Sequence, residues 1–411
     1  MLVPMSTAQR LISEELRAQL EADYRHLHAH PELSMQEHRT AAYIESRLTE
    51  LGVEHFTCGG TGVVGVIRNG EGPTLAYRAD TDGLPIAEET GLGWSSEVTG
   101  TLPDGTQVPV MHGCGHDTHV AVALAVARGL VEHRDAWSGT VVLVFQPGEE
   151  TAAGAAAMVE DGLWDRAPRP EAVYGQHVMP SETGTVGLAV GTAMAMADSW
   201  QVTLHGRQAH GSQPHNSIDP VVLGSHVVTR LQSVVSRTVD PRDMAVVTVG
   251  TFHAGTKENI IPRTAVLGLN VRTFKEHVRD TVLSGIRRTV EGEVIASGAP
   301  EAEIEELYRF PGCVNDPEES ERVLEALRAE LGEEQVRVIS PVSGSEDVGV
   351  LASAIGVPLV YWFNGGHPRE LLEGGEPVPG NHSPYFAPVP QPTLDTGLRA
   401  ALAVLLSRVG A

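Results

Sequence analysis

Apolar residues recur at helical spacing near the start of the chain. Between Ser13 and Leu51 they fall three or four positions apart, and the pattern is interrupted at the His30-Pro31 step. The residue before a proline disfavours helical geometry, so the interruption marks a boundary. The pattern therefore predicts two helices joined by a histidine-rich turn.

The next part of the chain alternates between apolar runs of two kinds. Residues Thr118–Val131 are rich in Ala and Val and apolar nearly all round, which is typical of a helix buried against a sheet. Around this helix, short β-branched runs predict four strands, at Val63–Ile67, Thr74–Ala79, Thr140–Phe145 and Ala172–Gln176. Alternating strands and helices indicate an α/β layer.

Around residues 183–191 the pattern changes to strands with alternating polar and apolar positions. The predicted order there is strand, helix, two strands and helix, at Ser199–Leu204, Pro220–Val235, Met244–Phe252, Ala265–Thr273 and Glu276–Ser297. This order is typical of a compact α+β domain. The α/β style then returns with a helix, a strand and a final helix at Glu318–Leu331, Val357–Trp362 and Leu394–Val409.

The change of pattern and its return predict two domains. We expect a discontinuous main domain, residues 1–188 and 306–411, with a second domain, residues 189–305, inserted into it. Two further segments, Thr101–Val110 and Gly365–Pro379, contain Gly and Pro. We predict that both are surface hairpins, with loops that contact a substrate as the alternative.

Charge narrows the classes of partner. The chain has 53 acidic and 29 basic side chains and a formal net charge of −24. Such a surface repels phosphate backbones and anionic lipids, so we expect neither nucleic acid nor a membrane as partner. No apolar run approaches the roughly 18 to 20 residues of a membrane span, which predicts a soluble, cytoplasmic protein. Three scattered cysteines are too few for a disulfide framework.

The densest chemical signal is the sequence MHGCGHDTH at Met111–His119. Cys114 and His116 lie two residues apart, and on extended backbone both side chains would point to the same side, as two ligands of one metal require. The alternative is a loop with an ordinary histidine and a buried structural cysteine.

Other candidate ligands follow predicted strands. Glu149 and Glu150 come after an apolar strand, and on extended backbone their side chains would point in opposite directions. One could then bind a metal while the other takes a proton from water. A solvated turn is the alternative. Strand ends also carry Asp80, Asp82 and His177, and His382 lies in a Gly- and Pro-rich loop. Together these positions favour a metal site.

The chain resembles the M20 peptidase family of metal-dependent amidohydrolases. The resemblance is to the branch of that family, its subfamily D, which contains N-acyl-amino-acid, indoleacetyl-amino-acid and hippurate hydrolases. It rests on motifs in the same order over nearly the whole length: His28-Ala-His-Pro-Glu-Leu-Ser34, Arg78-Ala-Asp-Thr-Asp82, Gly113-Cys-Gly-His-Asp117, Gln146-Pro-Gly-Glu-Glu150, Gly206-Arg-Gln-Ala-His210, Gly344-Ser-Glu-Asp347 and Asn381-His-Ser383.

The resemblance implies a site with two divalent metal ions in the larger domain. Its metal ligands would be Cys114, His116, Glu150, His177 and His382. Glu149 would be the general base for a metal-activated water, and Asp82 would orient a ligand. Many members have His-x-Asp where this chain has Asp80-Thr-Asp82. The thiolate favours zinc, with manganese, cobalt and nickel as alternatives.

The resemblance also implies an α/β fold with a mixed-sheet, zinc-peptidase-like catalytic domain. The insert would be a ferredoxin-like domain that serves as a lid and forms a homodimer. His210 would reach the neighbouring subunit's active site and stabilise an oxyanion. Asn259, Arg272 and Gly344 would bind the substrate.

The predicted activity is hydrolysis of the amide bond of N-acyl amino acids to a carboxylic acid and a free amino acid. One alternative is a metallo-dipeptidase or carboxypeptidase of the same fold. Another is a relative that binds a metal or small molecule without catalysis. Acylated and free substrates distinguish the two enzymatic interpretations.

Overall fold

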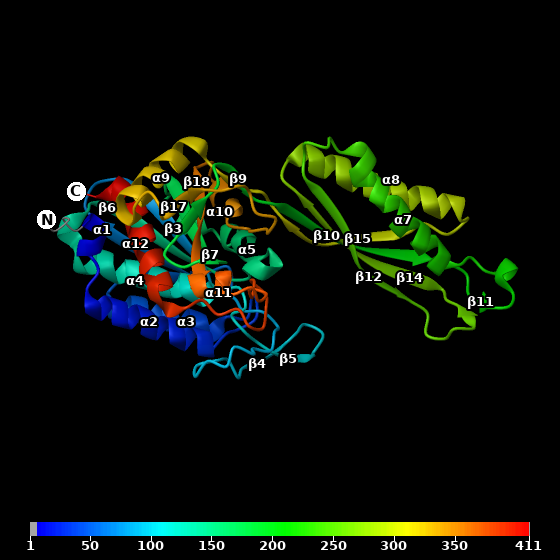
Figure 1. Ribbon diagram of the computed structural model, residues 1–411, viewed down its shortest axis with the longest axis horizontal. Helices are drawn as coiled ribbons and strands as arrows, with labels where there is room; N and C mark the ends of the chain where they lie inside the picture. The colour runs from blue at the N-terminus through cyan, green and yellow to red at the C-terminus, as the bar shows by residue number, and fades with distance from the viewer. Residues whose placement is uncertain (1–5, 411) are drawn as a thin grey trace. The chain divides into compact units, whose positions relative to one another are not determined.

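The computed structural model describes residues 6–410, which form two compact units (Figure 1). Of these residues, the first unit comprises 6–193, 314–341 and 347–410, and the second comprises Met194–Cys313 and Val342–Glu346. The chain passes between them through β9 (Gly191–Met194) and β16 (Cys313–Asn315), which pair with each other. No helix within residues 6–410 is long and apolar enough to cross a membrane.

The first unit is built on a mixed sheet of eight strands. Four central strands, β6, β3, β7 and β18, are parallel neighbours, while β1 and β2 extend one side in antiparallel fashion. The order is β1 (Glu54–Cys58), β2 (Gly62–Asn69), β6 (Gly139–Gln146), β3 (Thr74–Asp80), β7 (Ala172–Glu182), β18 (Leu359–His367), β8 (Val186–Leu188) and β17 (Val336–Val338). This confirms the predicted mixed α/β layer.

Helices enclose the sheet and supply the main core. Buried side chains of the helices α1 to α4, α9 and α12 pack in one cluster with those of the sheet. These helices span Thr7–Arg10, Glu14–Ala29, His38–Glu50, His116–Glu132, Pro317–Leu331 and Pro390–Val409. The shorter α5 (Gly154–Glu160), α6 (Leu163–Arg166), α10 (Gly349–Ser353) and α11 (Arg369–Glu373), with turns η1 (Arg134–Ala136) and η2 (Glu149–Thr151), complete the unit.

The two predicted N-terminal helices are confirmed as α2 and α3. The hydroxyl of Ser13 accepts a hydrogen bond from the Leu16 amide (3.1 Å), and Glu14 and Glu15 lie in the first turn of α2. A polar N-cap and early carboxylates both stabilise a helix start. The helix ends at Ala29, before the His30-Pro31 step, as predicted.

The four predicted strands are present, but β7 is longer than expected. It continues through His177 to Glu182, because its pairing with β18 extends from Val173 to Glu182. The prediction that His177 follows the end of its strand is therefore wrong. His177 lies within β7, opposite Phe363 of β18.

One of the two predicted hairpins is confirmed. Strands β4 (Thr99–Thr101) and β5 (Gln107–Pro109) form an exposed antiparallel pair. The hairpin predicted at Gly365–Pro379 is wrong, since β18 runs on to His367 and α11 follows it. A Cβ on Gly365 would lie 1.8 Å from the carbonyl oxygen of Glu182. This glycine therefore permits close strand pairing instead of a turn.

The second unit contains one antiparallel sheet of four strands, in the order β12, β14, β10, β15 (Figure 1). Their bounds are Ala245–Ala254, Thr264–Thr273, Met196–His205 and Glu303–Phe310. Helices α7 (Pro220–Thr238) and α8 (Glu276–Ala296) pack on the sheet and bury a second core. The short β11 (Ala209–His210), η3 (Pro214–Asn216) and β13 (Ile260–Ile261) complete this unit. All elements predicted here are present, and β15 is an additional strand.

Candidate metal centre

The candidate ligands gather where the central parallel strands of the first unit end. Strand β3 ends at Asp80, β6 ends at Gln146 just before Glu149 and Glu150, and α4 begins at His116. In open sheets of this kind, sites form outside the carboxyl ends of the strands. The sheet topology thus brings together residues that are distant in sequence.

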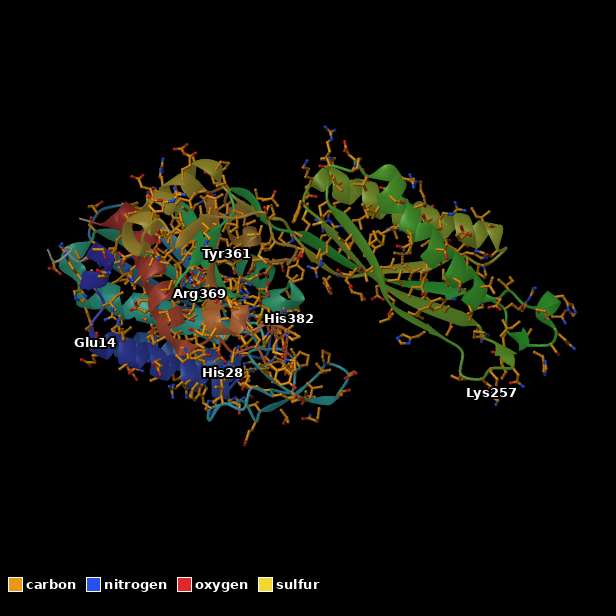
Figure 2. The ribbon with its side chains drawn as sticks, in the orientation of Figure 1. Glu14, His28, Lys257, Tyr361, Arg369 and His382 are labelled. Atoms are coloured by element: carbon orange, nitrogen blue, oxygen red, sulfur yellow. The ribbon has the colours of Figure 1, made fainter. Side chains whose placement is uncertain are left out.

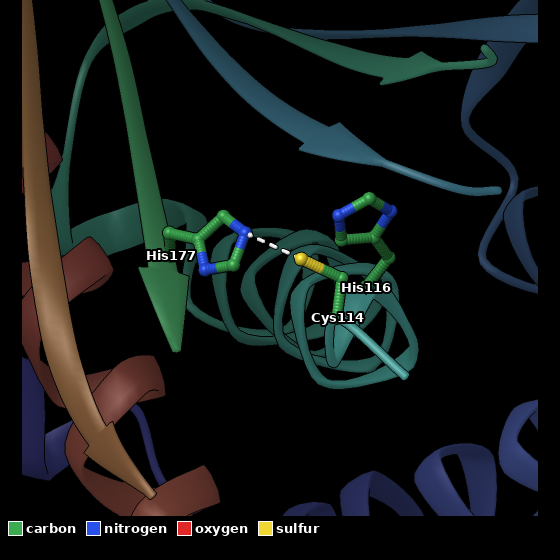
Figure 3. Close-up of side chains that lie close together, drawn as sticks. All are labelled: Cys114, His116 and His177. Carbon is green, nitrogen blue, oxygen red and sulfur yellow. Dashed lines mark hydrogen bonds between the residues drawn. The ribbon is translucent and has the colours of Figure 1, made fainter. Parts of the chain in front are cut away.

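Cys114, His116 and His177 form the first buried group (Figure 3). Their ligand atoms lie within 4.8 Å of one another, and the Cys114 Sγ lies 3.4 Å from His177 Nε2. His177 Nδ1 donates to the carbonyl of Val178 (2.7 Å), which leaves the Nε2 lone pair facing the thiol. Three soft or borderline donors in this arrangement suit a zinc-like divalent ion.

The backbone between Cys114 and His116 is not extended, contrary to the sequence-based expectation. Gly115 has φ +87 and turns the chain directly into α4, so His116 occupies the first helical position. A left-handed residue of this kind favours glycine. The two side chains still approach each other, but a turn brings them together instead of strand geometry.

Glu150 and His382 join Cys114 in a second group with ligand atoms within 4.8 Å of one another. His382 Nε2 lies 3.2 Å from Glu150 Oε1, and the His382 amide donates to the carbonyl of Gly113 (2.7 Å). Figure 2 labels His382 among the side chains of the first unit. The neighbouring Asn381 donates to the carbonyls of Cys114 (3.1 Å) and Val178 (3.2 Å), which fixes this loop against the site.

Two buried atoms at the centre of these groups have no hydrogen-bond partner among the described residues: His116 Nε2 and Glu150 Oε1. They lie 3.9 Å apart. His116 Nδ1 donates to Asp82, at the carbonyl (3.0 Å) and at Oδ1 (3.2 Å), so Nε2 is the nitrogen that the neutral ring would present to a metal. Buried polar atoms without a hydrogen bond are costly, and a divalent cation would satisfy both. The donor set therefore fits a metal centre.

Buried negative charge dominates the electrostatics of the candidate site. Burial raises the pKa of the Cys114 thiol, and the nearby Glu150 and Glu149 carboxylates raise it further. Burial alone would lower the pKa of His116, but Asp80 and Asp82 raise it to about 10. A bound divalent cation would reverse this balance and favour a thiolate and a neutral imidazole.

Glu149 lies beside the candidate ligands and is 5% exposed. Its carboxylate belongs to a group with His116 and Glu150 whose ligand atoms lie within 4.8 Å of one another. The expectation of extended backbone is wrong here as well, since Glu149 and Glu150 occupy the 3-10 turn η2. Asp82 contacts the candidate ligand His116 and also accepts the backbone amide of Glu150 (3.0 Å).

His119 is a site residue that the sequence analysis did not single out. Its Nε2 accepts from the Val178 amide (2.9 Å), so Nδ1 carries the proton that is donated to Asp80 in a short hydrogen bond. Both ring nitrogens are thereby used, and His119 holds β7 next to His177. Its spacing of three from His116 on one helix face was the available signal.

Two of the predicted second-unit residues lie at one end of that unit's sheet. His210 is exposed in β11, and its Nδ1 accepts from the Ser212 amide (3.1 Å). The Gly211 amide donates to the carbonyl of Asn259 (2.8 Å), so His210 and Asn259 lie close together. The nearby loop between β12 and β13 carries Lys257, labelled in Figure 2.

Arg272 and Gly344 lie at the other end of the same sheet. The Arg272 guanidinium donates from Nε to Asn270 Oδ1 (2.9 Å) and from Nη1 to the hydroxyl of Ser345 (2.6 Å). Gly344 accepts the Ala195 amide at its carbonyl (2.8 Å). Thr264 begins β14 at the end of the sheet nearest His210. Arg272 lies eight positions further along β14, so about 26 Å separates Thr264 from Arg272 at the usual strand rise. Within one chain these two pairs are apart.

A buried ion-pair network underlies the metal centre. His28 donates from Nδ1 to Asp117 (2.6 Å) and from Nε2 to Glu88 (3.1 Å). Burial alone would lower the pKa of His28, but the two carboxylates raise it to about 10. The network joins α2 to the first turn of α4, where His116 lies.

We expect the stabilising effect of His28 to depend on pH. Its folded-state pKa is raised above 6.5, so its contribution is complete below pH 6.5 and is lost as the pH rises through about 10. The free energy of unfolding should therefore differ most between wild type and His28→Gln at about pH 6.5, and the difference should shrink at about pH 9.5. Urea denaturation in one metal-replete buffer measures it. His133→Gln is the control, because His133 Nδ1 donates to a backbone carbonyl; a difference independent of pH would contradict the prediction.

Known proteins resemble this chain along most of its length. The family model described as peptidase family M20/M25/M40 matches residues 76–405. Amidohydrolase YhaA of Bacillus subtilis is 37% identical over 93% of each chain. N-acyl-L-amino acid amidohydrolase of Geobacillus stearothermophilus is 38% identical over 71% of this chain and 76% of its own. The structure of YXEP from Bacillus subtilis, a dinuclear metal-binding peptidase, matches with TM-score 0.74 and 30% identity over 96% of this chain and 99% of its own.

Proposed function

Because the chain belongs to peptidase family M20/M25/M40, we propose that it is a metal-dependent amidohydrolase of N-acyl amino acids. It would release a carboxylic acid and a free amino acid. The observation that carries this proposal is the buried group of a thiol and two imidazoles, with the carboxylates of Glu149 and Glu150 beside it. The activities of the relatives described above support the choice of substrate class.

We propose two divalent ions per chain, with zinc first and manganese, cobalt or nickel as alternatives. The residues that would hold them are Cys114, His116, Glu150, His177 and His382. When bound, the ions polarise the amide carbonyl and make water a stronger nucleophile at neutral pH. We place the enzyme in the cytoplasm, because a reducing compartment keeps buried cysteines as thiols.

Glu149 acts twice on protons in this scheme. Its carboxylate oxygen accepts a proton from the attacking water as the hydroxyl adds to the amide carbon. It then donates that proton to the leaving nitrogen as the carbon–nitrogen bond breaks. Asp82 holds the ring of His116 through Nδ1 and so keeps Nε2 directed into the site. Arg272, Asn259 and Gly344 would bind the substrate, with the guanidinium suited to its free carboxylate.

We propose that the second unit is a ferredoxin-like lid and dimerisation domain. The sequence patterns predicted this domain at residues 189–305. Its β-α-β-β-α-β order supports this assignment. Since about 26 Å of β14 separates Arg272 from the end of the sheet near His210, one small substrate can meet both only if they come from two chains. We therefore propose a homodimer in which His210 stabilises the oxyanion in its partner's site.

The outer edge of β12 supports a second copy as the partner. Among the described residues β12 pairs with β14 alone, which leaves its other edge open. Val246 and Phe252 of this strand are exposed, as are Val221 and Val222 of α7. An open apolar edge strand favours pairing with another chain, and a two-fold dimer would cover both copies.

Mixing two inactive variants tests the assignment of His210. Co-expressed Glu149→Gln and His210→Ala chains should recover about a quarter of wild-type activity, since half of the dimers are mixed and each has one complete site. The control mixes His210→Ala with the double variant Glu149→Gln/His210→Ala, which supplies no missing group. Recovery no greater than the sum of the separate variants would show that His210 does not act across an interface.

A substrate panel tests the proposed activity itself. Metal-replete enzyme is assayed with N-acetyl, N-benzoyl, N-indoleacetyl and long-chain N-acyl amino acids, their methyl esters and free dipeptides. We expect cleavage of the acylated acids and weak cleavage of the esters, which lack the carboxylate for Arg272. Cleavage of dipeptides alone would instead establish a peptidase. No cleavage with metal bound would indicate a non-catalytic protein.

A further inference from the structure

A short segment after α2 holds one side of the turn that carries Glu149. The buried Glu37 carboxylate accepts the backbone amides of Gly148 and Met35 at Oε1, both at 2.8 Å. Its Oε2 accepts the hydroxyl of Thr61 in a short hydrogen bond. Glu37 thus ties the residue preceding Glu149 to a distant part of the chain.

The other side of the turn is held from the same segment. Asp82 Oδ2 accepts the backbone amide of Glu150 (3.0 Å) and also the hydroxyl of Ser34 (2.6 Å). Consequently the backbone amides immediately before and after Glu149 both donate to buried carboxylates. One of those carboxylates belongs to Glu37 and the other is held by Ser34, which places Glu149 between two anchored positions.

Packing closes the turn against this segment. Gly148 has φ +57, and a Cβ at this position would lie 2.5 Å from the Met35 sulfur. The side chain of Met35 therefore lies against the Gly148 backbone, where only glycine fits. Displacement of the turn in that direction is blocked by contact.

A buried carboxylate at position 37 is unfavourable for the free energy of folding. Burial, reinforced by the charge of Asp82, raises its pKa to about 7. The donors that it contacts at Met35, Gly148 and Thr61 are all uncharged. A buried carboxylate held by uncharged donors costs free energy. A smaller or apolar side chain at position 37 could not place an acceptor oxygen at the Gly148 amide.

We propose that Glu37 is a positioning residue for the reaction. It fixes the backbone on the Gly148 side of Glu149, so that the Glu149 carboxylate is held at the position from which it takes the proton of the attacking water. The inference rests on the proposed function, in which Glu149 is the general base. A misplacement of about 1 Å costs on the order of 10²-fold in rate, which sets the expected effect.

Three substitutions of Glu37 separate geometry from charge in the metal-replete enzyme. Glu37→Ala should lower kcat by about 10- to 100-fold while KM stays within about twofold. Glu37→Gln should stay within about threefold of wild type, because its amide oxygen still accepts the Gly148 amide and Thr61 can reverse its hydroxyl. Glu37→Asp keeps the charge, but its side chain is shorter by one methylene, so kcat should fall about tenfold.

Glu32→Ala is the matched control. Glu32 is a buried carboxylate in the same segment, but it accepts the amide (2.8 Å) and hydroxyl (3.0 Å) of Thr40 in α3. It should lower thermal stability without lowering kcat. If Glu37→Ala lowers kcat no more than Glu32→Ala, or if Glu37→Asp is fully active while Glu37→Gln is not, the proposal is overturned. The comparison of Gln with Asp decides the question even if Glu37→Ala does not fold.

Two further measurements separate this proposal from the proposed function. In the Glu149→Gln background, Glu37→Ala should cause no additional loss, since both act through one group; additive losses would overturn the proposal. Hydrogen exchange of the Gly148 amide, which donates to Glu37, should be faster in Glu37→Ala and unchanged in Glu32→Ala. Unaltered exchange would overturn the positioning role. An enzyme inactive on the whole panel with the expected exchange behaviour would refute only the proposed function.

Discussion

Replacement of Glu149 by glutamine is expected to lower kcat for N-acyl amino acids by about 10³-fold, because an amide of the same shape cannot accept the proton of the attacking water. KM should change little, since Glu149 is not among the residues proposed to bind the substrate. The measurement is steady-state kinetics on a cleaved member of the substrate panel, with metal content determined for each preparation.

A matched control shows that the loss is specific to this carboxylate. Glu160 is an exposed glutamate at the end of the nearby α5. Glu160→Gln should retain wild-type kinetics. If Glu149→Gln keeps more than about a tenth of wild-type kcat, or if it is inactive only because it has lost metal, Glu149 is not the general base.

Removal of metal is expected to abolish the activity and to lower the thermal stability. Without a cation the half-buried Glu150 carboxylate lies beside Cys114, and His116 Nε2 has no hydrogen-bond partner among the described residues. Ligands that bind only the folded state at about 1,000 times their dissociation constant stabilise it by about 4 kcal/mol, so the apoprotein should melt earlier. Dialysis against a chelator, followed by calorimetry and by addition of zinc, manganese, cobalt or nickel, measures both effects.

Cys58, another buried cysteine, provides the control for this prediction. Cys114→Ser should lose metal and activity together. Cys58→Ser should retain two ions per chain, because the Cys58 thiol, at the end of β1, donates to the carbonyl of Met158 (3.3 Å) and belongs to none of the candidate ligand groups. An apoprotein that stays active, or a Cys114→Ser variant that still binds two ions, would contradict the proposed ligand set.

Periodicity was sufficient to predict most elements of both units. The Ala- and Val-rich run after His116 is the buried helix α4, and the alternation in Ser199–Leu204 is the half-buried strand β10. The length of β7 was not predictable, since it ends in Pro180, Ser181 and Glu182, which are atypical of a strand, and pairing with β18 extends to Glu182. A strand that depends on its neighbour has no periodic signal of its own.

The candidate site was predicted in its residues more than in its geometry. The sequence placed Cys114, Glu150, His177 and His382 in one site, and their ligand atoms do lie together in groups. The backbone that presents Cys114 and Glu150 is turned, not extended, because glycines at 115 and 148 adopt left-handed conformations. Glu37 carries no motif signal, and its role follows only from hydrogen bonds across 111 residues of sequence.

The distribution of the candidate ligands along the chain has a consequence for biosynthesis. Cys114, His116, Glu150 and His177 lie in the first half of the chain, while His382 lies near its end. When the first half of the chain has been synthesised, four of the five candidate ligands are present, and the second unit still separates them from the last. Closure of so long a loop is slow, and the centre is completed only once nearly all of the first unit exists. A chain that stops before residue 382 would therefore lack one of the five proposed ligands even if the rest of the first unit were in place.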